Sequence, residues 1–238
     1  MSLFVQMNLT CPSCDAVFTC KAVGSVNADR RPDLRDEILE ERFQIIHCSE
    51  CEHEFRLEPD FNYLDAGRQQ WIAALPARQL RDHLEIAAEK QGVFDGTYGK
   101  DAPEAAQAIG KDLLQRLVFG WPAMREKLVL QELGFDDVLM EVAKLDLLRI
   151  LPSAPLREGV ELRLAGADAE FLNFIWVEAA SEEVLNAFQA PRRLYDDIAK
   201  DPEPWVPVRA MLAAGMFVDM QKLFMGEGES ANQGEAAA

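Results

Sequence analysis

The sequence predicts an α+β protein in which a small cysteine-rich module of short strands precedes a mainly α-helical region with a β-hairpin. Three features support this prediction. Two cysteine pairs lie within residues 1–75. From residue 76 onward, apolar residues recur at helical spacing between Pro and Gly residues that end each segment. Two stretches between residues 160 and 177 are instead rich in β-favouring residues.

The cysteine pairs are Cys11-Pro12-Ser13-Cys14 and Cys48-Ser49-Glu50-Cys51, separated by residues 15–47. Two such pairs in one small module are typical of a tetrahedral zinc site with four thiolate ligands. We therefore predict that Cys11, Cys14, Cys48 and Cys51 bind Zn²⁺. Four thiolates leave no open position for water or substrate, so the predicted role of the ion is structural. A pair of redox disulfides is the alternative, but that chemistry favours a single Cys-x-x-Cys at a helix start near a βαβ pattern, which is missing here.

The residues around the two pairs favour tight turns. Pro12 sets the φ angle that such a turn needs. Asp15 and Glu52 follow the last cysteine of each pair, where a positive φ is common and Gly would be the best residue. Asp tolerates that conformation better than Glu, so the second turn is expected to be the less favourable one. His47 and His53 flank the second pair and are expected beside the site rather than among its ligands.

Residues 15–57 show a pattern of strands around one helix. We expect one or two strands over residues 17–26 with a turn at Gly24, a helix over residues 31–39, and strands over residues 43–47 and 53–57. This arrangement predicts a zinc ribbon with a helix inserted in its loop. The fifth cysteine, Cys20, lies within the first strand pattern and is expected to be a small buried residue rather than a reactive thiol.

Several segments between Val5 and Leu75 match one known family in order and spacing. They are Cys11-Pro12-Ser13-Cys14, Ser25-Val26-Asn27, Pro32-Asp33-Leu34, Phe43 through Phe55, and Tyr63-Leu64-Asp65. In these residues the chain resembles the CpXC family of bacterial and archaeal proteins. The family name records a proline in each cysteine pair, whereas Ser49 stands at that place in the second pair. No activity is established for the family, so the resemblance implies the metal site and no reaction.

The rest of the chain is divided by its helical and strand patterns. Expected helices cover residues 78–91, 103–119, 122–133, 137–151 and 192–200, and another one follows Ser181 with Val184, Leu185 and Phe188 on its apolar face. Expected strands cover residues 160–164 and 171–177, and residues 205–226 are expected to form a helix and then a strand. We therefore predict a module over residues 1–75, a mainly α-helical region over residues 76–226 with a sub-boundary near residues 152–155, and a disordered tail over residues 227–238.

The net charge of −17 disfavours partners with a phosphate backbone or an anionic surface, because both would be repelled. No signal peptide and no apolar run long enough to cross a membrane is recognisable in the sequence. Together with cysteines that are better suited to a metal than to disulfides, these features predict a cytoplasmic protein without a membrane partner.

No catalytic or nucleotide-binding motif was recognised, so no catalytic and no organic cofactor-binding residue is predicted. The acidic pairs Asp136-Asp137, Glu182-Glu183 and Asp196-Asp197 are each explained by an expected helix start. The sequence therefore favours a non-enzymatic zinc protein whose ribbon serves as a structural staple and as a surface for another protein.

Two other functions remain open. A nucleic-acid-associated regulatory protein would need a basic face, for which Arg30, Arg31, Arg35 and Arg42 would have to lie together. An enzyme with a site in the helical region would be recognised by a deep pocket with convergent acidic residues.

Overall fold

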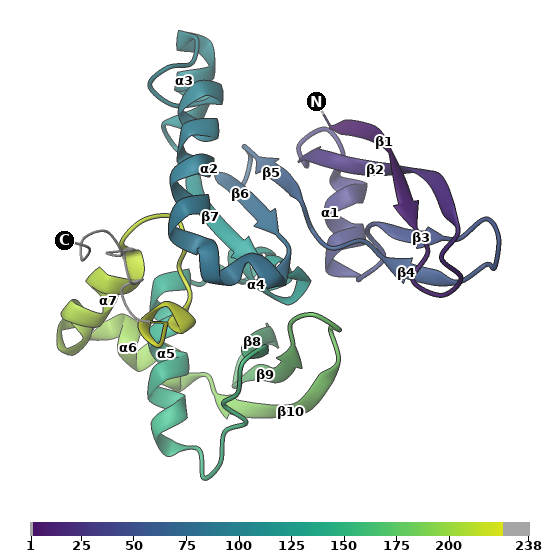
Figure 1. Ribbon diagram of the computed structural model, residues 1–238. Helices are drawn as coiled ribbons and strands as arrows, with labels where there is room; N and C mark the ends of the chain where they lie inside the picture. Colours follow the sequence, from purple (N-terminus) through teal and green to yellow (C-terminus); the bar gives the residue numbers. More distant parts are fainter. Residues whose placement is uncertain (1, 226–238) are drawn as a thin grey trace, which may run out of the picture.

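The computed structural model describes residues 2–225, and Figure 1 shows the arrangement of their helices and strands. At the N-terminus, β1 (Leu3–Thr10) and β2 (Val17–Asn27) form an antiparallel hairpin. After α1 (Pro32–Leu39), a second and much shorter hairpin consists of β3 (Ile45–His47) and β4 (Glu54–Arg56). The two hairpins point their turns in the same direction, away from the rest of the molecule (Figure 1).

A five-stranded sheet of order β1-β2-β5-β6-β7 forms the first half of the fold. Its other strands are β5 (Phe61–Asp65), β6 (Gln70–Leu75) and β7 (Leu114–Phe119), and β6 pairs antiparallel with β5 and parallel with β7. Between β6 and β7 the chain forms η1 (Ala77–Asp82), α2 (His83–Thr97) and α3 (Glu104–Gly110).

All six residues of β6 are buried because both faces of the strand are covered. Ile72 and Ala74 belong to a core shared with α1 and with α4 (Trp121–Leu133). Trp71 and Leu75, on the opposite face, belong to a core that includes Phe94 of α2. This strand, rather than the cysteine-rich hairpins, is thus the most completely buried strand of the first sheet.

The second half of the described chain is a three-stranded antiparallel sheet with helices on one side. Its strands are β8 (Val160–Ala167), β9 (Phe171–Glu178) and β10 (Val184–Pro191), with β9 in the middle. Its helices are α5 (Asp137–Ile150), α6 (Arg193–Lys200) and α7 (Val206–Ala213), and the short turns are η2 (Glu203–Trp205) and η3 (Met220–Leu223). One apolar core, with Leu162 and Trp176 from the sheet and Met140 from α5, joins these elements.

The prediction of an α+β protein is confirmed, but the description of residues 76–226 as mainly helical is not. The expected helix over residues 103–119 ends at Gly110, and residues 114–119 form β7. A side chain at Gly110 would overlap the backbone of Tyr98, which fixes a close approach there. Residues 114–119 then gain six backbone pairings with β6, a stabilisation that comes from a distant segment and that local helical spacing does not reveal.

The expected helix after Ser181 is also wrong. Val184, Leu185 and Phe188 lie in β10, which pairs with β9. Their spacing fits either a helix or a strand, and the free edge of β9 decides between the two. Residues 160–177 therefore belong to a three-stranded sheet and not to an isolated hairpin.

Other differences concern the ends of elements. The helix expected over residues 78–91 begins as η1 and continues as α2 to Thr97, beyond its expected end. Gly24 lies inside β2 and makes no turn. After α7 no strand forms among the described residues, although Phe217 makes a single bridge to Leu117 of β7.

Some of the helix ends signalled by single residues are confirmed, although Gly92 ends no helix and Ser181 starts none. Asp136 caps α5 through a 2.9 Å hydrogen bond that its carboxylate accepts from the N–H of Leu139. Gly134 ends α4 with a φ of 71°, which is left-handed and favours glycine. Helix α1 has Pro32 at its first position and buries Leu34 and Ile38, as the spacing predicts.

The division into domains stays a prediction. The boundary expected after residue 75 falls between β6 and η1, and β7 from beyond it completes the same sheet. Residues 152–155 belong to no helix or strand. Residue 226 and the tail expected over residues 227–238 lie outside the described residues. Within residues 2–225, no helix combines the length and the apolar character needed to cross a bilayer.

Candidate metal centre

The four predicted metal ligands meet at the turns of the two N-terminal hairpins. The sulfur atoms of Cys11, Cys14, Cys48 and Cys51 all lie within 4.8 Å of one another. The sulfurs of Cys11 and Cys51 are 3.6 Å apart, and those of Cys14 and Cys48 are 3.7 Å apart. Four sulfurs at about 2.3 Å from one tetrahedral ion would be separated by about 3.8 Å. The four cysteines are therefore positioned to bind a metal ion.

The two turns repeat the same backbone hydrogen bonds. In the first turn, the N–H of Cys11 donates to the carbonyl of Ala16, and the N–H of Asp15 donates to the carbonyl of Cys11. In the second, Cys48 N–H donates to His53 and Glu52 N–H donates to Cys48. The same geometry thus arises from two different sequences, and in both it aims two thiols out of one turn.

Two further N–H groups point at sulfur. Ser13 and Glu50 each donate a backbone hydrogen bond of 3.4 Å to the sulfur of the first cysteine of their pair. Burial raises the pKa of the Cys11 thiol, but hydrogen bonds from the backbone of Ser13 and Cys14 lower it more, so the pKa falls to about 7. Such donors stabilise the thiolate, which is the form that binds a metal ion.

The four cysteines differ in burial, and the difference is the same in both pairs. The first cysteine of each pair, Cys11 or Cys48, is buried, and the second, Cys14 or Cys51, is exposed. One side of the site therefore faces the protein and the other faces solvent. All five cysteines of the chain are free thiols.

The two histidines beside the second pair are not among the clustered ligands within residues 2–225. His47 has a largely exposed side chain 3.5 Å from the Glu54 carboxylate, and the ring of His53 stacks on Phe55. Cys20 is half-buried in β2, and burial raises the pKa of its thiol.

Three contacts fix the short β3–β4 hairpin to the rest of the fold. The Arg56 guanidinium lies 4.0 Å from the ring centre of Trp121 at the start of α4, and it forms a 2.7 Å ion pair with Glu182. The Trp121 indole N–H donates to the carbonyl of Leu57 at 2.8 Å. Because Glu182 comes from the loop before β10, the metal-binding region is tied directly to the C-terminal sheet.

Strand β1 is an edge of the five-stranded sheet and is exposed over nearly its whole length. Its sequence, Leu-Phe-Val-Gln-Met-Asn-Leu-Thr, contains no charged residue. The exposed fractions of Leu3, Val5 and Met7 are 56%, 39% and 39%. These alternate residues share one face of the strand. Natural edge strands usually carry charges or Pro that prevent pairing with another chain, and β1 has neither.

The arginines that a nucleic-acid-binding face would need are largely neutralised by neighbouring acidic residues. Arg31 pairs with Asp33, Arg35 lies between Asp36 and Asp65, and Arg42 pairs with Glu40. Arg30, the fourth of these arginines, has no ion pair within residues 2–225, so acidic residues neutralise three of the four positions.

Within residues 2–225, each acidic residue of these pairs except Glu183 caps a helix or lies in an ion pair. Asp136 caps α5, and the buried Asp137 carboxylate binds Arg116 and Lys127. Glu182 pairs with Arg56 although no helix starts there, and Asp196 and Asp197 lie in α6 near Arg192 and Lys200.

A cavity does contain acidic residues, but they are three that the sequence did not single out, Glu158, Glu161 and Asp219. The alternation of Val160-Glu161-Leu162-Arg163-Leu164 predicts that its charged residues face solvent. Instead Glu161 and Arg163 are each 3% exposed, because η3 and α4 cover that face of β8. The one feature of the sequence that could have indicated this burial is the pair of opposite charges two residues apart, on the same face of the strand.

The comparison with known families gives one match. A family model described as CpXC protein matches residues 9–144, a range that begins just before the first cysteine pair and ends within α5. The comparisons with curated proteins and with solved structures gave no match.

Proposed function

This chain belongs to the CpXC family, and from that premise we propose that its four cysteines hold a structural Zn²⁺ and that the stapled hairpins present β1 to another protein. The observation that supports zinc most directly is the pair of sulfur separations, 3.6 and 3.7 Å, close to those around a tetrahedral ion. Thiolates are soft ligands that select zinc over calcium or magnesium.

The need for a staple follows from the small size of the second hairpin. Strands β3 and β4 contain three residues each, and an isolated hairpin of that length is not stable in water. Contacts between the hairpins, such as the edge-to-face pair of Phe18 and Phe55, add little area. In this proposal the two hairpins form a zinc ribbon with α1 in its loop, and metal binding supplies much of its folding free energy.

The proposed surface for the partner protein is β1 with its apolar residues Leu3, Val5, Met7 and Leu9. A partner strand that pairs with this edge would satisfy its free backbone groups and cover these side chains. The ion stabilises the turn at the end of β1, so metal binding would fix the position of the strand. A nucleic acid is not proposed as the partner, because the chain is strongly acidic and most of its N-terminal arginines are paired with acidic residues.

The proposed role is non-enzymatic and the proposed location is the cytoplasm. Four thiolates around zinc leave no coordination position for a substrate. Free thiols throughout the chain fit a reducing compartment.

The proposal is tested by gentle purification from the native host after nuclease treatment, followed by native mass spectrometry. The wild type should carry one zinc ion and a stoichiometric protein partner. Met7→Lys should keep the zinc and lose the partner, whereas Cys48→Ser should lose both. Ile109→Lys, which changes an exposed apolar residue of α3, is the control and should keep both. A wild-type protein without zinc, or a Met7→Lys variant that keeps the partner, would contradict the proposal.

A further inference from the structure

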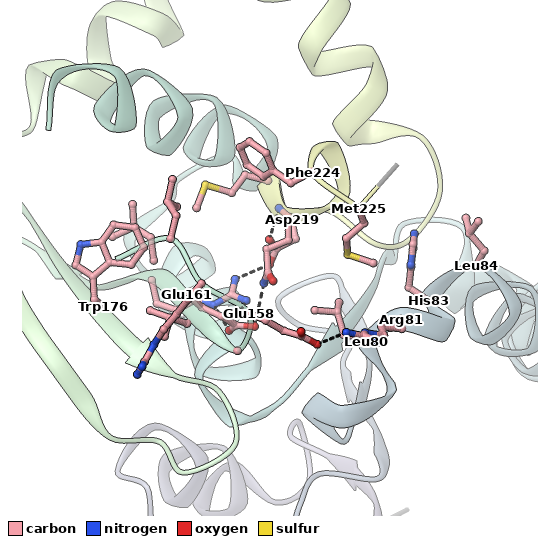
Figure 2. A pocket seen from close by; sticks show the side chains of 18 residues that line it. Leu80, Arg81, His83, Leu84, Glu158, Glu161, Trp176, Asp219, Phe224 and Met225 are labelled. Atoms are coloured by element: carbon pink, nitrogen blue, oxygen red, sulfur yellow. Dashed lines mark hydrogen bonds and ion pairs between the residues drawn. The ribbon is translucent and has the colours of Figure 1, made fainter. Parts of the chain in front are cut away.

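A cavity of about 670 Å³ lies between the two halves of the molecule. None of its lining residues comes from the segments that contain the cysteines. Figure 2 shows its lining side chains, with Trp176 on one side and Leu80, His83 and Leu84 on the other. Phe224 and Met225, from the C-terminal end of the described chain, lie between these two sides. The volume is in the range of small-molecule sites, and most of the lining is apolar, as such sites require.

The buried part of the wall carries charge. Arg163 of β8 donates to Glu161 at 2.6 Å and to Asp219 at 2.6 Å, and all three residues are nearly inaccessible to solvent. The Gln221 amide donates to the second carboxylate oxygen of Glu161 at 2.9 Å. Arg81 and Glu158 also line the cavity, and their paired side chains are largely exposed. They therefore mark the mouth of the cavity, and the buried Glu161 and Asp219 mark its inner end.

The inner end has an excess of negative charge. Behind the wall, the fully buried Lys144 binds Glu126 and Glu141, and Arg163 also binds Glu126. This network thus has four carboxylates, those of Glu126, Glu141, Glu161 and Asp219, against the two cations Lys144 and Arg163.

A second buried cluster next to this network reduces the excess but does not remove it. In it, the two cations Arg116 and Lys127 surround the single carboxylate of Asp137, so this cluster has one excess positive charge. Burial raises the pKa of Glu141 to about 7, and the neighbouring carboxylates of Asp219 and Glu126 act in the same direction. With all of these carboxylates ionised, the buried region beside the cavity lacks one positive charge. Because protonation of Glu141 supplies that charge, the deficit is complete only above about pH 7.

His83 contributes to the lining without adding charge. Its side chain lines the cavity and is 5% exposed, and its Nδ1 has no hydrogen-bond partner among residues 2–225. Burial lowers the pKa of His83, so the ring is neutral near pH 7 and does not repel a cation.

We propose that this cavity binds a small organic cation, an amine whose aliphatic or aromatic part packs against Leu84, Trp176 and Phe224 and whose ammonium group lies near Glu161 and Asp219. The apolar walls account for the body of the ligand. The missing positive charge accounts for its sign. The net charge of the protein also attracts cations from solution.

The chain itself does not supply a suitable occupant. Residues 226–238, which follow Met225, contain no Lys or Arg and no apolar side chain larger than Ala. A segment of that composition matches neither the walls nor the charge of the inner end. An external amine is therefore the occupant that the lining favours.

The test compares three probes of nearly equal size: phenethylamine, phenethyl alcohol and hydrocinnamate. Binding to the full-length zinc-loaded protein is measured by saturation-transfer NMR and by the shift in Tm. Phenethylamine should bind at least about tenfold more tightly than the alcohol, because a charge-assisted hydrogen bond in a buried site is worth that factor. Hydrocinnamate should not bind. Equal binding of the anion and the amine, or no binding of the amine, would overturn the proposal.

Two variants locate the binding. Leu84→Trp places a large side chain at the mouth and should abolish amine binding, whereas Ile109→Trp on α3 is the matched control and should leave it unchanged. Asp219→Asn should weaken amine binding about tenfold while alcohol binding changes little. Since Asp219 is buried, this variant is compared only if its circular dichroism spectrum and Tm show a folded protein. Amine binding that survives Leu84→Trp would by itself overturn the proposed location.

Discussion

Asp15 and Glu52, which follow the two cysteine pairs, have the same backbone φ of 58°. Neither residue is glycine, although this left-handed conformation costs an ordinary residue about 1 kcal/mol. The two turns also repeat each other's hydrogen bonds, so the same conformation forms from two different local sequences.

Glu52→Gly should therefore stabilise the zinc-loaded protein by about 1 kcal/mol, because glycine adopts a positive φ without strain. The free energy of unfolding in urea, measured with excess zinc, tests this. Glu50→Gly in the same turn is the control, since Glu50 has no positive φ and glycine there should destabilise the protein slightly. Equal effects of the two substitutions would refute the strain argument.

Removal of the metal should unfold the short β3–β4 hairpin and leave the C-terminal sheet intact. Strands β3 and β4 are too short to persist alone, whereas β8, β9 and β10 share a separate apolar core. Hydrogen exchange before and after treatment with a strong chelator should show lost protection in residues 45–56 and retained protection in residues 160–191.

The same experiment on single variants identifies the ligands. Cys48→Ser should reproduce the effect of the chelator in the presence of zinc. Cys20→Ser should retain both the metal and the protection, because Cys20 lies outside the cluster of four thiols. Loss of zinc from Cys20→Ser would show that the assignment of ligands is wrong.

Lys144 is fully buried between Glu126 and Glu141, with Nζ–O distances of 2.7 and 2.8 Å. Lys144→Met should destabilise the protein by about 3–5 kcal/mol, because two buried carboxylates lose their main counter-charge. Lys100→Met removes an exposed pair with Asp95 and should cost less than about 1 kcal/mol. Chemical denaturation of both variants gives the comparison, and similar losses would contradict it.

The ion pairs of Asp137 with Arg116 and Lys127 should make the stability of the protein depend on pH in the acid range. Burial raises the pKa of Asp137, but Lys127 and Arg116 lower it more, so it lies well below its usual value in the folded protein. The unfolded chain then binds more protons, and this contribution to stability is complete above about pH 5 and is lost as the pH falls below about 4.

Asp137→Asn should remove this dependence together with about 3 kcal/mol of stability at neutral pH. Urea unfolding between about pH 3 and pH 7 should show the two proteins converging as the pH falls. A difference between wild type and variant that stays constant with pH would refute the role given to Asp137.

Two glycines in helices provide a matched pair. A Cβ at Gly110 would overlap the carbonyl of Tyr98, whereas a Cβ at Gly92 would have no atom within 4 Å. Gly110→Ala should lower Tm, because the backbone of one segment must move. Gly92→Ala should raise it through a gain of about 0.5–1 kcal/mol in helix propensity. Thermal unfolding of the two variants should therefore shift in opposite directions.

The sequence by itself determined the metal ligands and the ends of several helices. Cys-x-x-Cys pairs, a proline at the start of α1, Asp136 before α5 and Gly134 after α4 act through contacts within a few residues, so their effects can be read locally. The positive φ at Asp15 and Glu52 follows from the turn that two cysteines on one ion require.

Only the tertiary structure decided which segments became β7 and β10 and what the charged residues of β8 would face. Residues 114–119 and 184–191 have apolar spacings that also fit a helix. They form strands because each segment pairs with an available strand edge, that of β6 or that of β9. Glu161 and Arg163 are buried because α4 and η3 cover them and supply Glu126 and Asp219. Pairing and burial of this kind depend on non-local contacts, and for that reason the cavity and its charge could not be derived from local spacing.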